Sequence, residues 1–109
     1  MRPIPRRLLA DTAAFSAPDA SARWAGGFGE PVEWDRVRVE LDVDSVGVRW
    51  ADDARPSCVV YVDAVNSRPA APPALGSLAE VAGLTGTVTA VRPRCGLGGR
   101  PHHWEVDVR

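Results

Sequence analysis

The strongest constraint on the fold is an alternation of apolar and polar residues with period two, which recurs along the chain. In residues 37–41, valine and leucine alternate with arginine and glutamate, and residues 46–50 and 104–108 repeat the pattern. A β-strand points successive side chains to opposite faces, so this alternation is typical of strands with one buried and one solvated face. The chain is therefore predicted to be mostly β.

Further strand and turn signals lie between these segments. Residues 58–65 form the most apolar stretch, rich in β-branched side chains, and are expected to be a central strand. Residues 86–91 are also β-rich, whereas 7–15 and 78–84 fit either a strand or a short helix. Turn-forming residues predict loops at 16–29, 51–57, 66–76 and 94–101.

Five or six short strands with evenly spaced turns are typical of a small antiparallel β-barrel or sandwich. We expect a single domain over residues 1–109 with long loops. The first nine residues contain two prolines and are expected to form an extended N-terminal arm.

Composition narrows the possible functions. The chain has 109 residues, 45% of them hydrophobic and 25% charged, as in an ordinary globular domain. A net charge of −1 disfavours a general nucleic-acid-binding protein, which would carry a basic excess.

Neither a signal peptide nor a membrane-spanning segment is recognisable, so we expect a soluble protein made in the cytoplasm. All 13 basic residues are arginine, which fits either codon bias or guanidinium contacts at interfaces.

The sequence offers no pattern typical of catalysis or of a cofactor. Residues 96–99 are glycine-rich but lack the Lys-Ser/Thr ending of a phosphate-binding loop. His102 and His103 are adjacent, and in a strand they would point to opposite faces, which is a poor arrangement for sharing a metal. Cys58 and Cys95 are too few for a disulfide framework. We therefore expect no catalytic residue, no cofactor and no metal, and not an enzyme.

Three pieces of the chain together carry a resemblance to a known family. The first is Ile-Pro-Arg-Arg-Leu-Leu at 4–9, followed by Glu-Pro-Val at 30–32 and Val-Arg-Val at 37–39, and the second is Tyr-Val-Asp-Ala-Val-Asn-Ser-Arg-Pro at 61–69. The third is residues 88–93, a glycine-rich gap and His-His-Trp-Glu-Val at 102–106. Their order and spacing resemble the minor capsid or head-completion proteins of tailed bacteriophages, also known as head-closure or stopper proteins. The steps at 66–69 and 102–105 are the most specific parts. Residues 84–87 depart from the family, which often has a Gly-Arg-Glu-Tyr-type turn at this place.

The resemblance implies a structural virion protein of the neck, the connector between phage head and tail, with a β-barrel fold. Such subunits form a homo-oligomeric ring, a hexamer or a dodecamer, that closes the DNA channel after packaging and provides the surface on which the tail docks. Portal or adaptor proteins lie above, and tail-tube, tail-terminator or tail-completion proteins lie below. Genomic DNA passes through without sequence-specific binding. An adaptor or tail-completion protein of the same neck, or a small OB-like binding module, remains an alternative.

Two sets of residues are candidates for these roles. Arginine and tryptophan are favoured at interfaces, and the candidate partner contacts are Arg2, Ile4, Arg6, Arg7, Trp24, Trp34, Arg94 and Arg100. For the two tryptophans, an interface and a core position are equally compatible with the sequence. An acidic lining would repel phosphates and let DNA slide, and the candidate channel-lining residues are Asp42, Asp44, Asp52 and Asp53.

Overall fold

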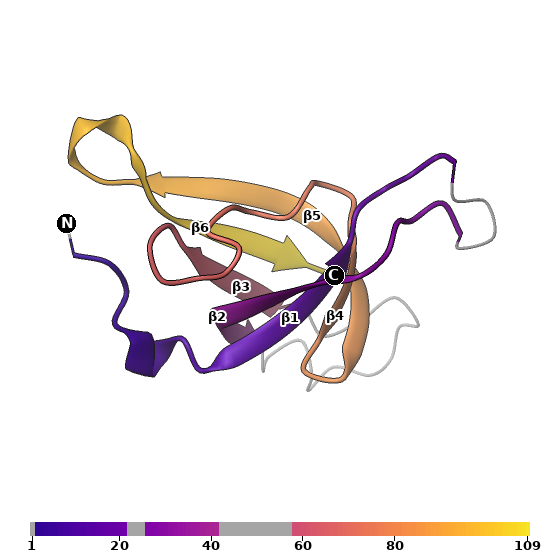
Figure 1. The fold of residues 1–109 in the computed structure, drawn as a ribbon, viewed down its shortest axis with the longest axis horizontal. Helices are drawn as coiled ribbons and strands as arrows, with labels where there is room; N and C mark the ends of the chain where they lie inside the picture. The colour runs from indigo at the N-terminus through magenta and orange to yellow at the C-terminus, as the bar shows by residue number, and fades with distance from the viewer. Residues whose placement is uncertain (1, 22–25, 42–57) are drawn as a thin grey trace, which may run out of the picture.

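The chain folds as a closed barrel of six antiparallel strands, in the order β1-β2-β3-β6-β5-β4 (Figure 1). The computed structural model describes residues 2–21, 26–41 and 58–109. The strands are β1 (Asp11–Ser16), β2 (Val32–Leu41), β3 (Cys58–Asp63), β4 (Leu78–Val81), β5 (Leu84–Cys95) and β6 (Pro101–Val108). Pairing of β4 with β1 closes the barrel, and none of the six described strands keeps a free edge. The expected mostly β fold is confirmed, and of the two expected architectures the barrel is the one that forms.

Alternating side chains from all six strands fill the barrel. Valine dominates this core, and Val37, Val60, Val62 and Val106 are completely buried. Phe15 from β1 and Trp34 from β2 add the two large rings, which meet edge to face with centroids 5.2 Å apart. β-Branched and aromatic side chains suit a pleated, enclosed surface, which explains why these segments form strands.

A β-bulge at Arg36 in β2 changes which residues point inward. Val37 pairs with Asp11 and Asp35 pairs with Thr12, so Arg36 is an extra residue on its strand. Its φ of 56° is unusual for a residue other than glycine. Because an extra residue shifts the alternation by one, Trp34 and Val37 face the same core despite their three-residue spacing.

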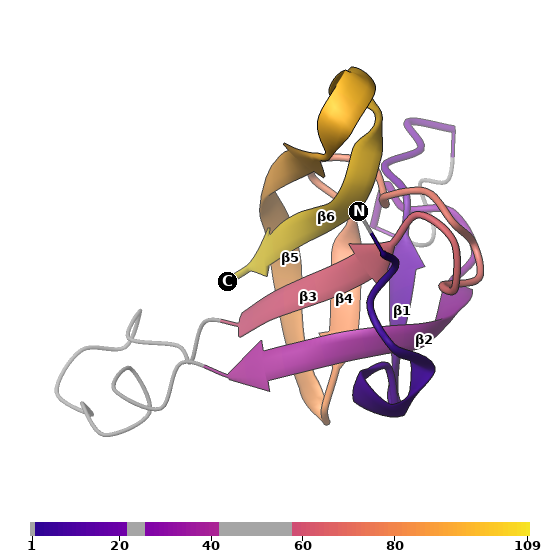
Figure 2. The same ribbon diagram turned by 90° about the vertical axis from the view of Figure 1, so that its left-hand side faces the viewer.

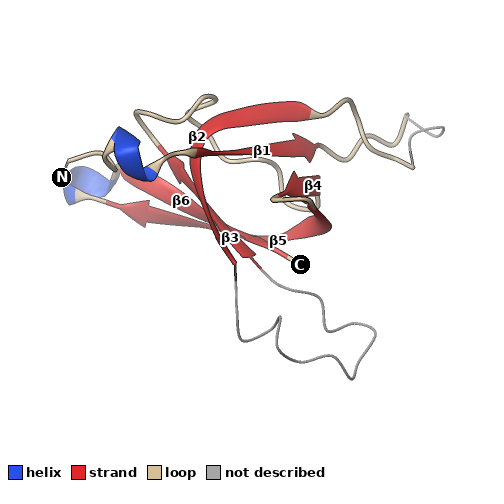
Figure 3. Cartoon of the chain, turned by 90° about the horizontal axis from the view of Figure 1, so that it is seen from below, coloured by secondary structure: helices blue, strands red, loops and turns tan. Residues whose placement is uncertain are grey.

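The longest strand, β5, joins the two halves of the barrel. It pairs with β4 through residues 84–87 and with β6 through residues 88–95. The end of β5 and the start of β6 extend as a two-stranded ribbon, whose tip contains the short 3-10 turn η3 (Leu97–Gly99), as Figures 1 and 3 show. The loop expected at 94–101 is therefore shorter, because Arg94 and Cys95 belong to β5 and Pro101 begins β6.

The N-terminal arm lies across the outside of the barrel, near the end of β3 and the start of β1 (Figure 2). Residues 2–5 have no regular secondary structure, and a 3-10 turn, η1 (Arg6–Leu8), follows them. Leu9 is buried and fixes the root of the arm to the barrel. The arm is thus extended only in part. The ambiguity at 7–15 is resolved as this turn followed by β1, and that at 78–84 as β4 and a tight turn into β5.

Candidate functional site at the arm clasp

Asp63, at the end of β3, is the centre of the contacts that hold the arm. By strand alternation it follows Tyr61 on the outer face of the barrel, yet it is completely buried, with contacts from the arm and from the turn that follows β3. One carboxylate oxygen accepts the Ile4 backbone N–H at 3.0 Å. The other accepts the backbone N–H groups of Val65 at 3.0 Å and Asn66 at 2.7 Å. Asp63 therefore ends β3, turns the chain and binds the arm.

Two further side chains complete this site, and we refer to Asp63, Asn66 and His102 together as the arm clasp. The Asn66 side-chain amide donates to the Ile4 carbonyl oxygen at 2.9 Å. His102 Nε2 contacts the Arg2 carbonyl oxygen. The Arg6 guanidinium also donates to the Asn66 side-chain oxygen, at 3.4 Å. Apart from this last bond, the hydrogen bonds that the clasp makes to the arm engage its main-chain atoms.

Ser67 connects the clasp to the bulge in β2. It is completely buried, and its hydroxyl accepts the Asp63 backbone N–H at 2.7 Å and donates to the Arg36 carbonyl oxygen at 2.6 Å. Arg68 and Asp35 exchange two backbone hydrogen bonds, of 2.7 and 3.0 Å. The connection after β3 thus supports both the arm and the strained residue of β2.

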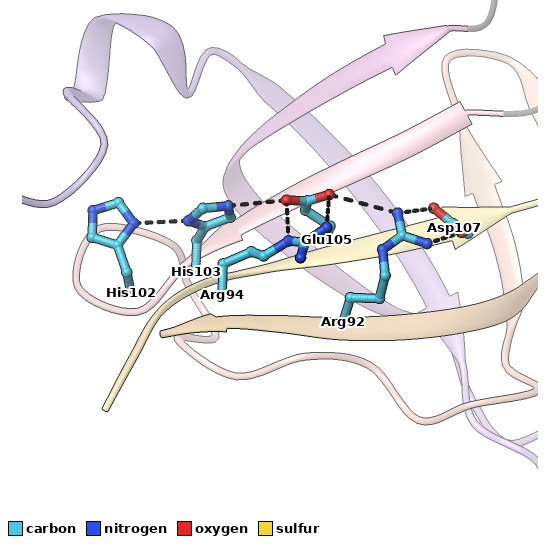
Figure 4. Close-up of polar contacts among 6 residues, drawn as sticks. All are labelled: Arg92, Arg94, His102, His103, Glu105 and Asp107. Carbon is cyan, nitrogen blue, oxygen red and sulfur yellow. Dashed lines mark hydrogen bonds and ion pairs between the residues drawn. The ribbon is translucent and has the colours of Figure 1, made fainter. Parts of the chain in front are cut away.

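A row of paired charges, which we call the charged ladder, runs along the outer face of β5 and β6 (Figure 4). Arg92 forms a bidentate pair with Asp107, in which Nη2 lies 2.8 Å from one carboxylate oxygen. Arg94 Nε lies 2.7 Å from the Glu105 carboxylate, which Arg92 also approaches at 3.6 Å. Hydrogen bonding by Arg94 is the main reason that the pKa of Glu105 is lowered. The pKa of Arg92 is raised, chiefly by its hydrogen bonds to Asp107.

The two adjacent histidines connect the charged ladder to the arm clasp. Their Nδ1 atoms lie 2.7 Å apart, and His103 Nε2 is 3.5 Å from the Glu105 carboxylate (Figure 4). The expectation that the rings point to opposite faces is therefore wrong. Arg94 pairs with His103 and Cys95 with Pro101, so His102 is the extra residue of a bulge, which re-aims its side chain. The contact between the two Nδ1 atoms requires one ring to donate and the other to accept.

Of the expected partner contacts, the four in the arm lie together. Arg2, Arg6 and Arg7 are exposed, and Ile4 is half-buried at the clasp. Arg100 is exposed at the tip of the β5–β6 ribbon.

The structure also places two further candidate contacts, Arg94 and Trp34, and the remaining candidates lie outside the described residues. Arg94 lies in a strand and its guanidinium is already paired with Glu105. Trp34 is only 9% exposed, packs in the core and donates its indole N–H to the Ala71 carbonyl at 2.8 Å, so of the two positions that the sequence leaves open it occupies the core. The remaining expected residues lie outside the described ranges: Trp24, Asp42, Asp44, Asp52 and Asp53.

Sequence reasoning did not identify the roles of Asp63, Asn66 and Ser67. The signal that could have found them is a polar Asp at the end of an apolar strand, followed by Asn and Ser, which is typical of a side-chain-capped turn. Their contact with the arm could not be found in this way, because it joins residues about 60 positions apart.

Comparison with known proteins found no matching family model, no matching curated protein and no matching solved structure. Within residues 2–21, 26–41 and 58–109, no group of three or more His, Cys, Asp or Glu side chains is placed to hold a metal ion. The helical turns in the same ranges are too short to cross a membrane.

Proposed function

We propose that this protein is a structural subunit of a tailed-phage neck, a stopper that closes the DNA channel after packaging and offers a docking surface to the tail. The observation that carries the proposal is the meeting of three distant segments at the arm clasp. Residues 4–9, 61–69 and 102–106 are parts of the resemblance to head-completion proteins. Ile4 bonds to Asp63 and Asn66, and the Ala64 N–H donates to the His102 carbonyl oxygen at 3.1 Å, so the three segments are in contact. The most specific parts of the resemblance thus contribute to one site, the arm clasp, which holds an arginine-bearing arm.

The closed barrel suits a ring subunit. A barrel has no free strand edge with which to associate, so its neighbours must be contacted through projecting segments or the barrel's outer surface. The described chain offers two such segments, the arm with its exposed arginines and the tip of the β5–β6 ribbon with Arg100. A ring with head-to-tail contacts needs two different surfaces on each subunit, and these two segments are our candidates for them.

The alternatives receive less support. An OB-like nucleic-acid-binding face would present basic side chains free to contact phosphates, whereas Arg92 and Arg94 are both paired with carboxylates of β6. Neck adaptors are typically helical, and the described part of this chain consists of strands, loops and 3-10 turns. The acidic residues Asp42, Asp44, Asp52 and Asp53 remain our candidates for the channel lining, on the charge argument alone.

Deleting the gene from the phage that encodes it tests the proposal. We expect filled heads that lose DNA and carry no tails, visible by negative-stain electron microscopy and by nuclease sensitivity of the packaged genome. Supplying the full-length chain from a plasmid should restore tailed particles. Tailed, infectious particles formed without the gene would rule out the stopper role.

A further inference from the structure

The arm clasp recognises the arm mainly by its main chain. Asp63 accepts the Ile4 N–H, Asn66 donates to the Ile4 carbonyl, and His102 contacts the Arg2 carbonyl. All three clasp residues belong to the barrel and its connections. The same bonds would form with residues 2–4 of any copy of this chain, so the clasp has no means of distinguishing its own arm from that of a neighbour.

The segment between the clasp and the barrel is built to open. The turn η1 contains no buried residue, and its backbone hydrogen bonds are those from Leu8 to Pro5 at 2.9 Å and from Leu9 to Arg6 at 3.0 Å. Pro5 already has extended backbone angles, with φ −57° and ψ 137°. Converting three residues from a 3-10 turn to an extended chain would lengthen the arm by roughly 4 Å and change its direction. Buried Leu9 would keep the root of the arm in place.

We propose that neighbouring copies exchange their arms, so that residues 2–4 of one subunit occupy the clasp of the next. The root of the arm and the clasp are different surfaces of the barrel, so each subunit gives one arm and receives one, which is the head-to-tail pattern that closes a ring. This proposal depends on the proposed function in one respect only: the phage neck is the place where we expect the exchange to occur.

Effective concentration explains when exchange takes place. In an isolated subunit the attached arm is always near its own clasp and outcompetes the arms of other molecules. When subunits are held side by side in a ring, a neighbour's arm gains the same advantage. An exchanged arm makes the same clasp bonds, but now between two subunits, so these bonds link neighbours without any new contact at the clasp.

Shortening the hinge tests the proposal on the purified protein. Deletion of Arg6 and Arg7 removes two of the three residues of η1, so the arm can no longer reach its own clasp. We expect concentration-dependent oligomers by size-exclusion chromatography with light scattering, whereas Arg6→Ser with Arg7→Ser, which removes the same charges at full length, stays monomeric.

A second change confirms that the clasp holds these oligomers together. Adding Asp63→Ala to the deletion variant should return it to monomers, with circular dichroism reporting that the barrel is retained. A folded deletion variant that remains monomeric at every concentration would overturn arm exchange, as would oligomers that persist without Asp63.

Cross-linking in assembled particles distinguishes a failure of arm exchange from a failure of the proposed stopper function. Pro3 and Val65 line one small pocket together with His102, so cysteines at both positions, with exposed Cys95 changed to Ser, should react with a short bis-maleimide. We expect a link within one chain in the isolated protein and a ladder of linked chains in the neck. Links confined to single chains in particles that contain the protein would exclude exchange and leave the stopper role intact. Absence of the protein from particles would contradict the stopper role, and the deletion variant would still decide whether arms exchange.

Discussion

Trp34 shows how one residue can decide the interpretation of a strand. The Val37–Leu41 alternation, extended backwards, would place Trp34 on the solvent face of β2. The bulge at Arg36 reverses this, and the indole packs against Phe15. Sequence alternation predicts faces only as long as the register is unbroken, and the bonds from Ser67 and Arg68 that support this bulge come from more than 30 residues away.

A core position for Trp34 predicts a large effect on stability. Trp34→Ala should lower the free energy of unfolding by about 3–5 kcal/mol, because it leaves a cavity beside Phe15 and removes the bond to the Ala71 carbonyl. Urea unfolding followed by circular dichroism measures this change. Val32→Ala, on the same strand but 49% exposed, is the control and should change stability by less than about 0.5 kcal/mol. A Trp34→Ala protein as stable as the control would contradict the core position of Trp34.

Gly86 occupies a position where no larger residue fits. A Cβ atom built there would lie 2.8 Å from the Arg109 carbonyl oxygen and 2.9 Å from a Val108 methyl carbon. The neighbouring Thr87 exchanges two backbone hydrogen bonds with Arg109, of 2.8 and 3.0 Å, so the two segments are held close.

We expect Gly86→Ala to destabilise the protein by about 1–3 kcal/mol, because the backbone must separate at a point of strand pairing. Thermal unfolding measures the loss, and hydrogen exchange at the Thr87 and Arg109 amides should rise. The exposed neighbour Thr85 provides the control, since Thr85→Ala introduces no such contact. Equal stability of the two variants would contradict the close approach.

At the scale of elements, the sequence predicts strands better than it predicts their ends and partners. Residues 58–65 were expected as one central strand, and β3 indeed begins at Cys58, but it stops at Asp63, where the carboxylate turns the chain. The expected loop at 94–101 is shortened at both ends, where Arg94 and Cys95 belong to β5 and Pro101 to β6. Arg94 pairs with Glu105 across these two strands. Both differences depend on side-chain bonds, which hydrophobic alternation does not encode.

The charged ladder should make the stability of the β5–β6 ribbon depend on pH. The pKa of Glu105 is lowered from its ordinary 4.5, chiefly by hydrogen bonding to Arg94. A lowered folded-state pKa means that the carboxylate stabilises the fold fully above its unfolded pKa, and that this contribution is lost as pH falls through the folded value. The difference in stability between the parent and Glu105→Gln should therefore be largest near pH 7 and should shrink towards zero as pH falls below about 4.5.

Unfolding at a series of pH values measures this difference, with Glu80→Gln on the exposed face of β4 as the control for loss of one negative charge. Arg94→Gln should move the pKa of Glu105 back towards its ordinary value, which carboxyl carbon NMR can follow. If Arg94→Gln does not change the pKa of Glu105, the ion pair between Arg94 and Glu105 is not the cause of the lowered pKa.

At the scale of the whole molecule, the barrel and the arm are separable parts. The main core cluster is formed by strand residues and contains no residue of the arm. Barrel closure depends on the β1–β4 and β5–β6 pairings, which the arm does not enter. The molecule therefore combines a self-sufficient scaffold with an attached segment held by hydrogen bonds, and loss of the segment should affect assembly far more than folding.

Deletion of residues 2–7 puts this separation to the test. The variant loses the Ile4 bonds to the clasp, but Asp63 then faces water and keeps its bonds to Val65 and Asn66, so we expect a loss of only about 1 kcal/mol in the free energy of unfolding. Unfolding should stay cooperative, and the strand signature in circular dichroism should be retained. If the proposed neck function is right, phage particles made with this variant should contain neither the protein nor a tail. The full-length variant with Arg6→Ser and Arg7→Ser separates loss of charge from loss of the arm. Normal incorporation of the deletion variant would show that the arm has no part in assembly, and an unfolded variant would show that the barrel depends on it.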